Sequence, residues 1–120
     1  MIAHIVLFRP RPDMTAADVG GLIDVFTRAV EQIPSVRSTR VGRRIRTGAG
    51  YEQLAQPDLT YVAVVEFDDV AGLRLYLEHP AHDEVGRRFW DAATEQLVYD
   101  FELDGDIERA IGLREDSGLL

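Results

Sequence analysis

The residues best suited to chemistry lie in one short stretch, from Tyr76 to His82. This stretch contains a tyrosine and two of the chain's three histidines, His79 and His82. Imidazole titrates close to neutral pH, and a phenol can donate a hydrogen bond to an oxygen that gains charge during a reaction. The stretch is therefore typical of acid–base chemistry, provided that the backbone holds the three rings in fixed directions.

Pro80 predicts such a rigid joint. A proline disfavours the helical conformation of the residue before it, so His79 is expected to end one helix. Pro80 then fits the first turn of a following helix, where its missing N–H costs little, and Asp83 and Glu84 complement the positive end of that helix. A structural interpretation competes with the catalytic one, because the free ends of two helices need polar partners and histidine supplies them.

The composition indicates one acidic, globular domain. The chain has 120 residues, 46% hydrophobic and 28% charged, with a formal net charge of −8. The negative charge argues against nucleic acid or a membrane as a partner. The chain has no cysteine, which excludes disulfides and thiolate chemistry, and three histidines without a clustered carboxylate make a poor metal site. We expect a cytoplasmic protein with no metal and no cofactor.

Hydrophobic periodicity predicts the order of the elements. Thr15 is a good N-cap for a first helix that Pro34 ends, and a second helical stretch is broken at Pro80. Strands are predicted at Ile2–Phe8, Val36–Arg46, Leu59–Phe67 and Gln96–Leu103. The order is βαββαβ, which predicts an α+β, ferredoxin-like fold. The domain should span residues 1–104, and residues 105–120 form a C-terminal extension with one or two helical turns that end at Gly112.

The second predicted strand carries five arginines, which permit two interpretations. They form either a patch for anionic ligands or the charged surface of an edge strand that discourages pairing with other chains. The acidic character of the whole chain favours the edge strand. The five are Arg37, Arg40, Arg43, Arg44 and Arg46.

The strands Ile2–Phe8 and Leu59–Phe67 are apolar on both faces, which predicts a dimer. Alternation places His4, Val6 and Phe8 together on one face of the first strand. Helices of this fold cover only one face of the sheet, so something else must cover the other face, and a second copy of the chain is the simplest solution. Two facing sheets would enclose a barrel, and we expect a pocket for a small apolar or aromatic molecule in its interior.

Several short motifs occur together along the chain. They are Ile2-Ala-His4-Ile-Val-Leu-Phe8, Ile33-Pro34-Ser-Val36, Val65-Glu66-Phe67, Tyr76 with His79-Pro80-Ala81-His82, and Asp100-Phe101-Glu102. In this combination, from about Ile2 to Leu103, the chain resembles the stress-responsive A/B barrel (Dabb) domain family. The resemblance implies a homodimeric α/β barrel built from ferredoxin-like protomers.

The resemblance also implies an activity. The plant polyketide cyclases of this family, which are similar to this chain around Tyr76 and His82, close a ring by a cofactor-independent aldol reaction that a histidine and a tyrosine drive. Carried over by motif, the catalytic residues are His82, as the base, and Tyr76. We expect the substrate to contact His4, Val6, Phe8, His79, Phe89 and Trp90.

Two other functions are compatible with the same residues. One is a non-catalytic, stress-related or ligand-binding dimer in which the histidines are structural. The other is a cofactor-free monooxygenase of the wider dimeric α+β barrel group, acting on quinol-like aromatics. The discriminating feature is an open apolar pocket that His82 and Tyr76 reach.

Overall fold

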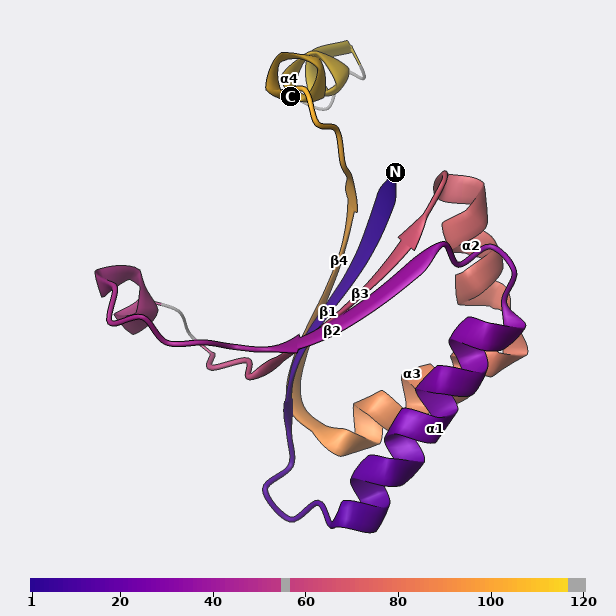
Figure 1. Ribbon diagram of the computed structural model, residues 1–120, viewed down its shortest axis with the longest axis vertical. Coiled ribbons are helices and arrows are strands. Elements are labelled where there is room, and N and C mark those ends of the chain that lie inside the picture. Colours follow the sequence, from indigo (N-terminus) through magenta and orange to yellow (C-terminus); the bar gives the residue numbers. More distant parts are fainter. Residues whose placement is uncertain (55–56, 117–120) are drawn as a thin grey trace.

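The computed structural model describes residues 1–54 and 57–116, and its elements follow the predicted order (Figure 1). Helices α2 and α3 together occupy the second helical position of the βαββαβ arrangement. The elements are β1 (Ile2–Pro10), α1 (Ala16–Gln32), β2 (Ser38–Arg43), η1 (Gly50–Gln53), β3 (Tyr61–Phe67), α2 (Val70–Glu78), α3 (Pro80–Ala92), β4 (Ala93–Glu102) and α4 (Ile107–Asp116). None of the described helices is both long and apolar enough to span a membrane.

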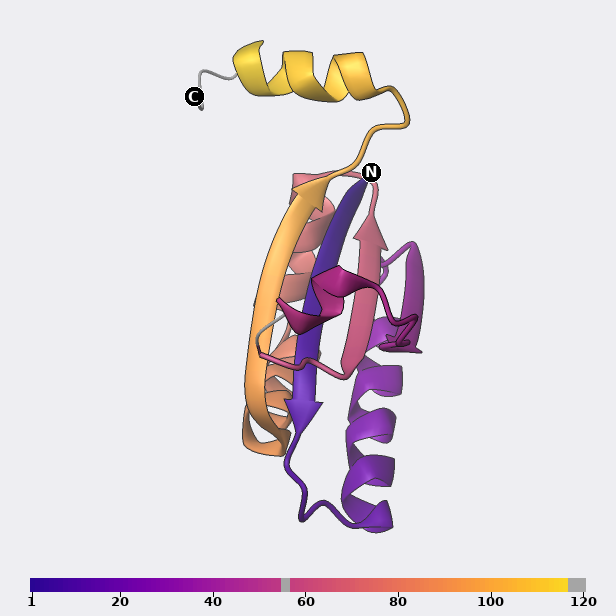
Figure 2. The same cartoon turned by 90° about the vertical axis from the view of Figure 1, so that its left-hand side faces the viewer.

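The four strands form one antiparallel sheet in the order β2-β3-β1-β4. The central strand β1 pairs with both β3 and β4, and this register places His4 between Val65 and Asp100. Helices α1, α2 and α3 cover one face of the sheet and leave the other face open (Figures 1 and 2). This is the ferredoxin-like α+β arrangement, as the sequence predicts.

The helix ends are set by local side chains. At the start of α1, the backbone N–H of Asp18 donates to Thr15 Oγ1 and the N–H of Thr15 donates to the Asp18 carboxylate, which completes a capping box. At the joint between α2 and α3, His79 is both the C-cap of α2 and the N-cap of α3, and Pro80 occupies the first turn of α3. The His79 imidazole Nδ1 accepts a hydrogen bond from the Ala81 N–H at 3.0 Å. The predicted joint is therefore confirmed.

The hydrophobic core lies between the helices and the covered face of the sheet. Val65 and Phe67 of β3 are the largest fully buried side chains, and Val25 and Ala29 of α1 pack against them. Ile33, the residue after α1, completes this layer before Pro34 turns the chain toward β2.

Strand β2 lies at an edge of the sheet and is shorter than predicted, because β3 begins only at Tyr61, opposite Arg43. The edge-strand interpretation of the arginines is supported by ion pairs with neighbouring carboxylates. These pairs are Arg37–Asp68, Arg40–Glu66, Arg44–Asp58, Arg46–Asp58 and Arg46–Glu52. Arg43 makes no ion pair with any side chain that the structure describes.

The predicted loop Thr47–Asp58 contains a short 3-10 helix, η1, and residues 55 and 56 lie outside the described part of the chain. The Glu52 carboxylate accepts hydrogen bonds from the backbone N–H groups of Thr47, Gly48 and Ala49. These hydrogen bonds lower the pKa of Glu52, and the bond from the Thr47 N–H contributes most. The described residues 47–54 thus form an arm that extends from the open side of the sheet (Figure 1).

The C-terminal extension forms α4, which stands away from the sheet and from the other helices (Figures 1 and 2). Its first turn is fixed by Asp106, which accepts a hydrogen bond from the Arg109 N–H, and by an ion pair between Arg109 and Asp104. The prediction that the helix ends at Gly112 is wrong, since α4 continues through that glycine to Asp116. Residues 117–120 of the extension lie outside the described part.

The extension is expected to be separable from the domain. A chain that ends at Asp104 should unfold at nearly the same temperature as the full chain, because the core described above is complete by β4. Thermal unfolding followed by circular dichroism measures this directly. Aggregation of the shortened chain, or a melting temperature several degrees lower, would mean that residues after Asp104 pack against the core or against a second copy.

Candidate functional site

Three aromatic rings from three elements meet on the helix-covered face of the sheet. Tyr76 lies near the end of α2, His82 in the first turn of α3, and His4 on β1. The ring centroids are 4.7 Å apart for Tyr76 and His82, 5.7 Å for His4 and Tyr76, and 6.4 Å for His4 and His82. The structure therefore brings the two predicted catalytic residues and the predicted pocket histidine into one cluster.

This cluster borders a cavity of about 210 Å³, which we name the histidine cavity. The cavity lies within the single chain, between the sheet and the helices, so His4, Tyr76 and His82 face the helix-covered side of the sheet rather than its open face, where the sequence predicted the pocket. Alternation correctly groups His4, Val6 and Phe8, but the sequence does not reveal that the helices pack on their side of β1. The lining residues are His4, Val6, Phe26, Ala63, Val65, Tyr76, Leu77, His82, Val85, Gly86, Phe89, Gln96 and Val98.

His4 is held in place by Asp100 of the neighbouring strand. The two residues are register partners in the β1–β4 ladder, and His4 Nδ1 lies 2.6 Å from Asp100 Oδ1. An ionised carboxylate can only accept, so Nδ1 carries the proton and donates it to Asp100. His4 is buried, and its other nitrogen, Nε2, is therefore left for a partner in the cavity.

Burial keeps both catalytic candidates neutral near pH 7. Desolvation raises the pKa of Tyr76 to about 12, so its phenol remains a hydrogen-bond donor. The pKa of His82 is lowered, mainly by desolvation and to a smaller extent by the nearby His4. Asp83 and the Leu77 carbonyl act in the opposite direction, but their effects are smaller. The pair therefore offers a neutral base and a neutral donor on the same cavity wall.

Gln96 adds a polar group without a partner. Its side-chain Oε1 is buried and makes no hydrogen bond with the described part of the protein, and Gln96 lines the histidine cavity from β4. Buried side-chain oxygens in folded proteins are nearly always hydrogen-bonded. A ligand with a hydroxyl or N–H group would satisfy this one.

The remaining predicted contact residues divide into two groups. Val6 and Phe89 line the histidine cavity, and Phe8 lines the adjoining cavity described below. His79 uses its ring as a helix cap, and Trp90 is 72% exposed and lines neither of the two cavities. Adjacent residues on a helix point about 100° apart, so Phe89 and Trp90 cannot both face the sheet.

Sequence reasoning missed the contact of Asp100 with His4 and the position of Gln96 at the histidine cavity. In the sequence, Asp100 stands out only as part of the Asp100-Phe101-Glu102 motif, and Gln96 only as the start of the last predicted strand. Both lie on the helix-covered face of β4, where the alternation of β4 against β1 could have placed them if the register had been known.

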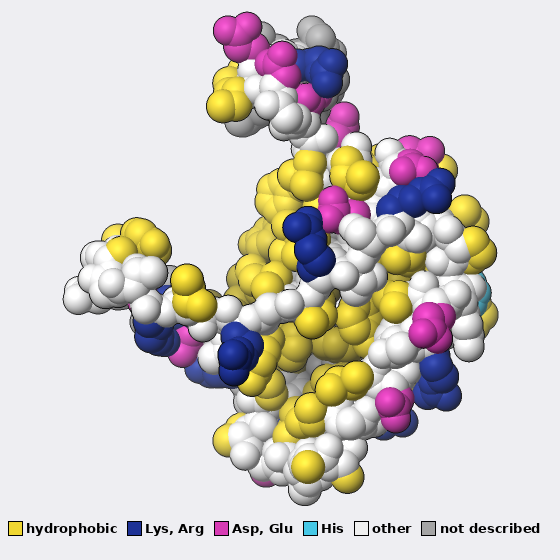
Figure 3. Space-filling model, viewed as in Figure 1, with side chains coloured by type: hydrophobic (Ala, Val, Ile, Leu, Met, Phe, Trp, Pro, Cys, Tyr) yellow, Lys and Arg dark blue, Asp and Glu magenta, His cyan; other side chains and the backbone are white. Residues whose placement is uncertain are grey.

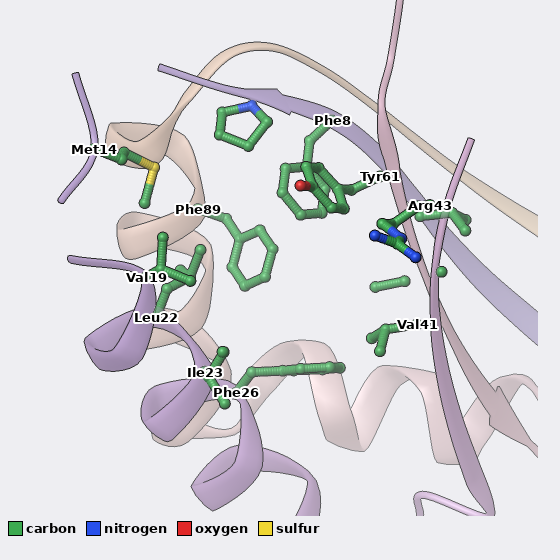
Figure 4. Close-up of a pocket in the computed structure, with 14 residues that line it drawn as sticks. Phe8, Met14, Val19, Leu22, Ile23, Phe26, Val41, Arg43, Tyr61 and Phe89 are labelled. Atoms are coloured by element: carbon green, nitrogen blue, oxygen red, sulfur yellow. The ribbon is translucent and has the colours of Figure 1, made fainter. Parts of the chain in front are cut away.

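A larger cavity of about 430 Å³, here named the aromatic cavity, adjoins the first and shares Phe26, Ala63 and Phe89 with it (Figure 4). It contains no histidine. The smaller cavity is the candidate site, because the groups that can transfer protons line it. Among the described residues, no group of three or more His, Asp or Glu side chains is arranged to hold a metal ion.

Comparison with known proteins agrees with the fold. A family model described as the stress-responsive A/B barrel domain matches residues 2–103. The chain belongs to this family. It is similar to olivetolic acid cyclase from Cannabis sativa, with 21% identity over 103 residues that cover 83% of this chain and 94% of the relative.

Two solved structures illustrate the structural similarity. A dimeric ferredoxin-like protein from Thermobifida fusca has a TM-score of 0.66 and 24% identity, covering 85% of this chain and 90% of its own. A hydroxynitrile lyase from Passiflora edulis has a TM-score of 0.71 and 17% identity, covering 88% and 95% of the two chains. At these identities the similarity establishes the shared fold.

The lowered pKa of His82 predicts a dependence of stability on pH. In the unfolded chain this imidazole has its ordinary pKa near 6.5. Because the folded pKa is lower, the unfolded state binds more protons over the interval between the two values, so stability falls as the pH falls through it. Urea unfolding should be measured at several values between about pH 5 and 7. As the pH falls over this range, the free energy of unfolding should decrease less for His82→Gln than for the wild type. Equal losses would contradict the burial of His82 as a neutral ring.

Proposed function

We propose that this protein binds a small apolar or aromatic carbonyl compound in the histidine cavity and acts on it by cofactor-independent, aldol-type proton transfer. The observation that carries the proposal is the cluster of His82, Tyr76 and His4 around one cavity. The reaction consists of removing a proton next to a carbonyl group, after which the carbanion attacks a second carbonyl. The new carbon–carbon bond replaces the π bond of that carbonyl, and the resulting alkoxide takes up the proton that was removed in the first step.

His82 acts as the base in this proposal. Its lowered pKa keeps the imidazole unprotonated at neutral pH, so it can accept the proton from the carbon next to the carbonyl. Tyr76 donates a hydrogen bond to the carbonyl oxygen as that oxygen becomes an enolate. The raised pKa of Tyr76 suits this role, because the phenol does not lose its proton to water.

His4 and Gln96 position the substrate. With Nδ1 fixed on Asp100, His4 presents Nε2 as an acceptor for a substrate hydroxyl. The unpartnered Gln96 oxygen supplies a second acceptor on the same cavity. His4 lies on β1, whereas Gln96 lies on β4 opposite Phe8, so the two acceptors occupy different positions along the sheet. Two separate acceptors can fix the orientation of a ligand, which one contact cannot do.

The named relatives support enzymatic activity for this arrangement. One relative is a cyclase and one structural neighbour is a lyase, so the fold accommodates catalysis in both. The cyclase also covers most of this chain, including the Tyr76–His82 stretch.

The proposal is tested by proton exchange, which isolates its first step. In heavy water the protein should catalyse deuterium exchange at the methyl group next to the carbonyl of para-butylacetophenone, followed by NMR. His82→Gln should lower the protein-dependent rate about 100-fold, since general-base catalysis contributes at least that much. Tyr76→Phe should lower it by a similar factor, because the enolate loses its donor.

A matched histidine variant provides the control. His79→Asn keeps a good helix N-cap while removing the other imidazole of the stretch, and it should leave the exchange rate unchanged. Exchange that is no faster than in buffer, or that is the same in His82→Gln and the wild type, would refute the proton-transfer role. Binding of the ketone without exchange would instead establish a non-catalytic ligand-binding protein.

We further propose that the working protein is a homodimer formed through the open face of the sheet. Solved relatives are dimeric ferredoxin-like proteins. On β4 the open face exposes the large apolar side chains Leu97, Tyr99 and Phe101, and Figure 3 shows apolar side chains gathered along this side of the molecule. A continuous apolar surface of this kind is typical of a protein interface.

Sedimentation velocity at micromolar concentration checks the dimer. The wild type should sediment as a dimer, and Phe101→Glu should shift it to a monomer, because the interface would bury an unpaired charge. Leu75→Glu, on the exposed outer side of α2, is the matched control and should remain dimeric. A well-folded monomeric wild type would rule the dimer out.

A further inference from the structure

The aromatic cavity has properties that the proton-transfer proposal does not use. It lies between α1 and the β1, β2 and β3 strands, and its volume is about 430 Å³. Figure 4 shows helix residues such as Leu22, Ile23 and Phe26 on one side and the strand residues Val41 and Arg43 on the other. Apart from Arg43, its wall is overwhelmingly apolar.

Aromatic side chains form a continuous part of this wall. The Phe8 and Tyr61 rings are stacked, with centroids 5.6 Å apart and an interplanar angle of 25°. Phe89 meets Phe8 edge to face at 5.1 Å, and also meets Phe26 edge to face at 6.1 Å. Aromatic rings favour further rings in stacked or edge-to-face geometry, so this wall suits an aromatic ligand.

Among the residues that the structure describes, Arg43 is the one charged residue that lines the cavity. It is the register partner of Tyr61 and lies on the helix-covered face of β2. The other four arginines around β2 pair with carboxylates, whereas Arg43 has no ion-pair partner among the side chains that the structure describes. In a chain of net charge −8, an arginine without such a partner at an apolar cavity provides a local site for an anion.

We propose that the aromatic cavity is a binding site for an aryl carboxylate. The aromatic ring of the ligand packs against Phe8, Tyr61 and Phe89, and its carboxylate accepts two parallel hydrogen bonds from the Arg43 guanidinium. This site does not require proton transfer by His82.

Isothermal titration calorimetry on the full chain tests the site with a matched pair of probes, para-butylbenzoate and para-butylbenzamide. The two share shape and size but differ in charge. The wild type should bind the benzoate about tenfold more tightly than the amide, a factor typical of a charge-assisted hydrogen bond at a partly exposed site. Arg43→Met should abolish that difference and leave the amide affinity unchanged, because the methionine keeps the apolar stem.

Three comparisons keep the outcome unambiguous. Arg74→Met removes an exposed arginine of α2 and should keep the tenfold preference. Arg43→Lys should recover only part of it, since an ammonium lacks the planar fork. His82→Gln should bind the benzoate as the wild type does, so failure of the exchange reaction and failure of this site are distinguishable.

The results that overturn the proposal are equally specific. Equal binding of the benzoate and the amide by the wild type would remove the role of Arg43. Equal losses in Arg43→Met and Arg74→Met would show a general charge effect rather than a site. Binding of neither probe would show that the cavity does not take this class of ligand.

Discussion

The structure depends on covering both faces of β1. The backbone of this strand is hydrogen-bonded to β3 on one edge and to β4 on the other. Its remaining contacts with the rest of the protein are therefore made by its two rows of side chains. One row, which includes His4, Val6 and Phe8, packs toward α2 and α3 and forms the floor of both cavities. The other row belongs to the open face. The same alternation that builds the core therefore also separates the site from the surface that we assign to a partner.

The joint at His79–Pro80 converts this floor into a site. Because the two helices meet at one extended residue, Tyr76 at the end of α2 and His82 at the start of α3 are fixed on the same side, above His4. The structural interpretation of the histidines applies to His79, and the catalytic interpretation stays a proposal for His82. His79 satisfies the free N–H of Ala81, as a capping residue should, and this leaves His82 free to face the cavity.

Much of the fold could be predicted from the sequence, because it is encoded in local patterns. The Thr15 capping box, the Pro80 corner and the two-faced strands each depend on residues near one another in the chain. The site required information that local patterns lack. The pairing of His4 with Asp100 depends on strand register, and the location of the pocket depends on which face of β1 the helices cover. Phe89 lines the cavity and Trp90 does not, because neighbouring residues on a helix point in different directions.

The electrostatics of the site bear on how such an acidic protein would stabilise the enolate of the proposed reaction. The net charge of −8 opposes the formation of negative charge anywhere in the molecule. Burial leaves His82 and Tyr76 uncharged, so a carbonyl ligand would enter without repulsion from the site itself. When the proton moves to His82, an imidazolium forms next to the enolate, and the two charges compensate each other within the cavity. In a site of low polarity that attraction is stronger than in water, and this favours proton transfer between groups that both start neutral.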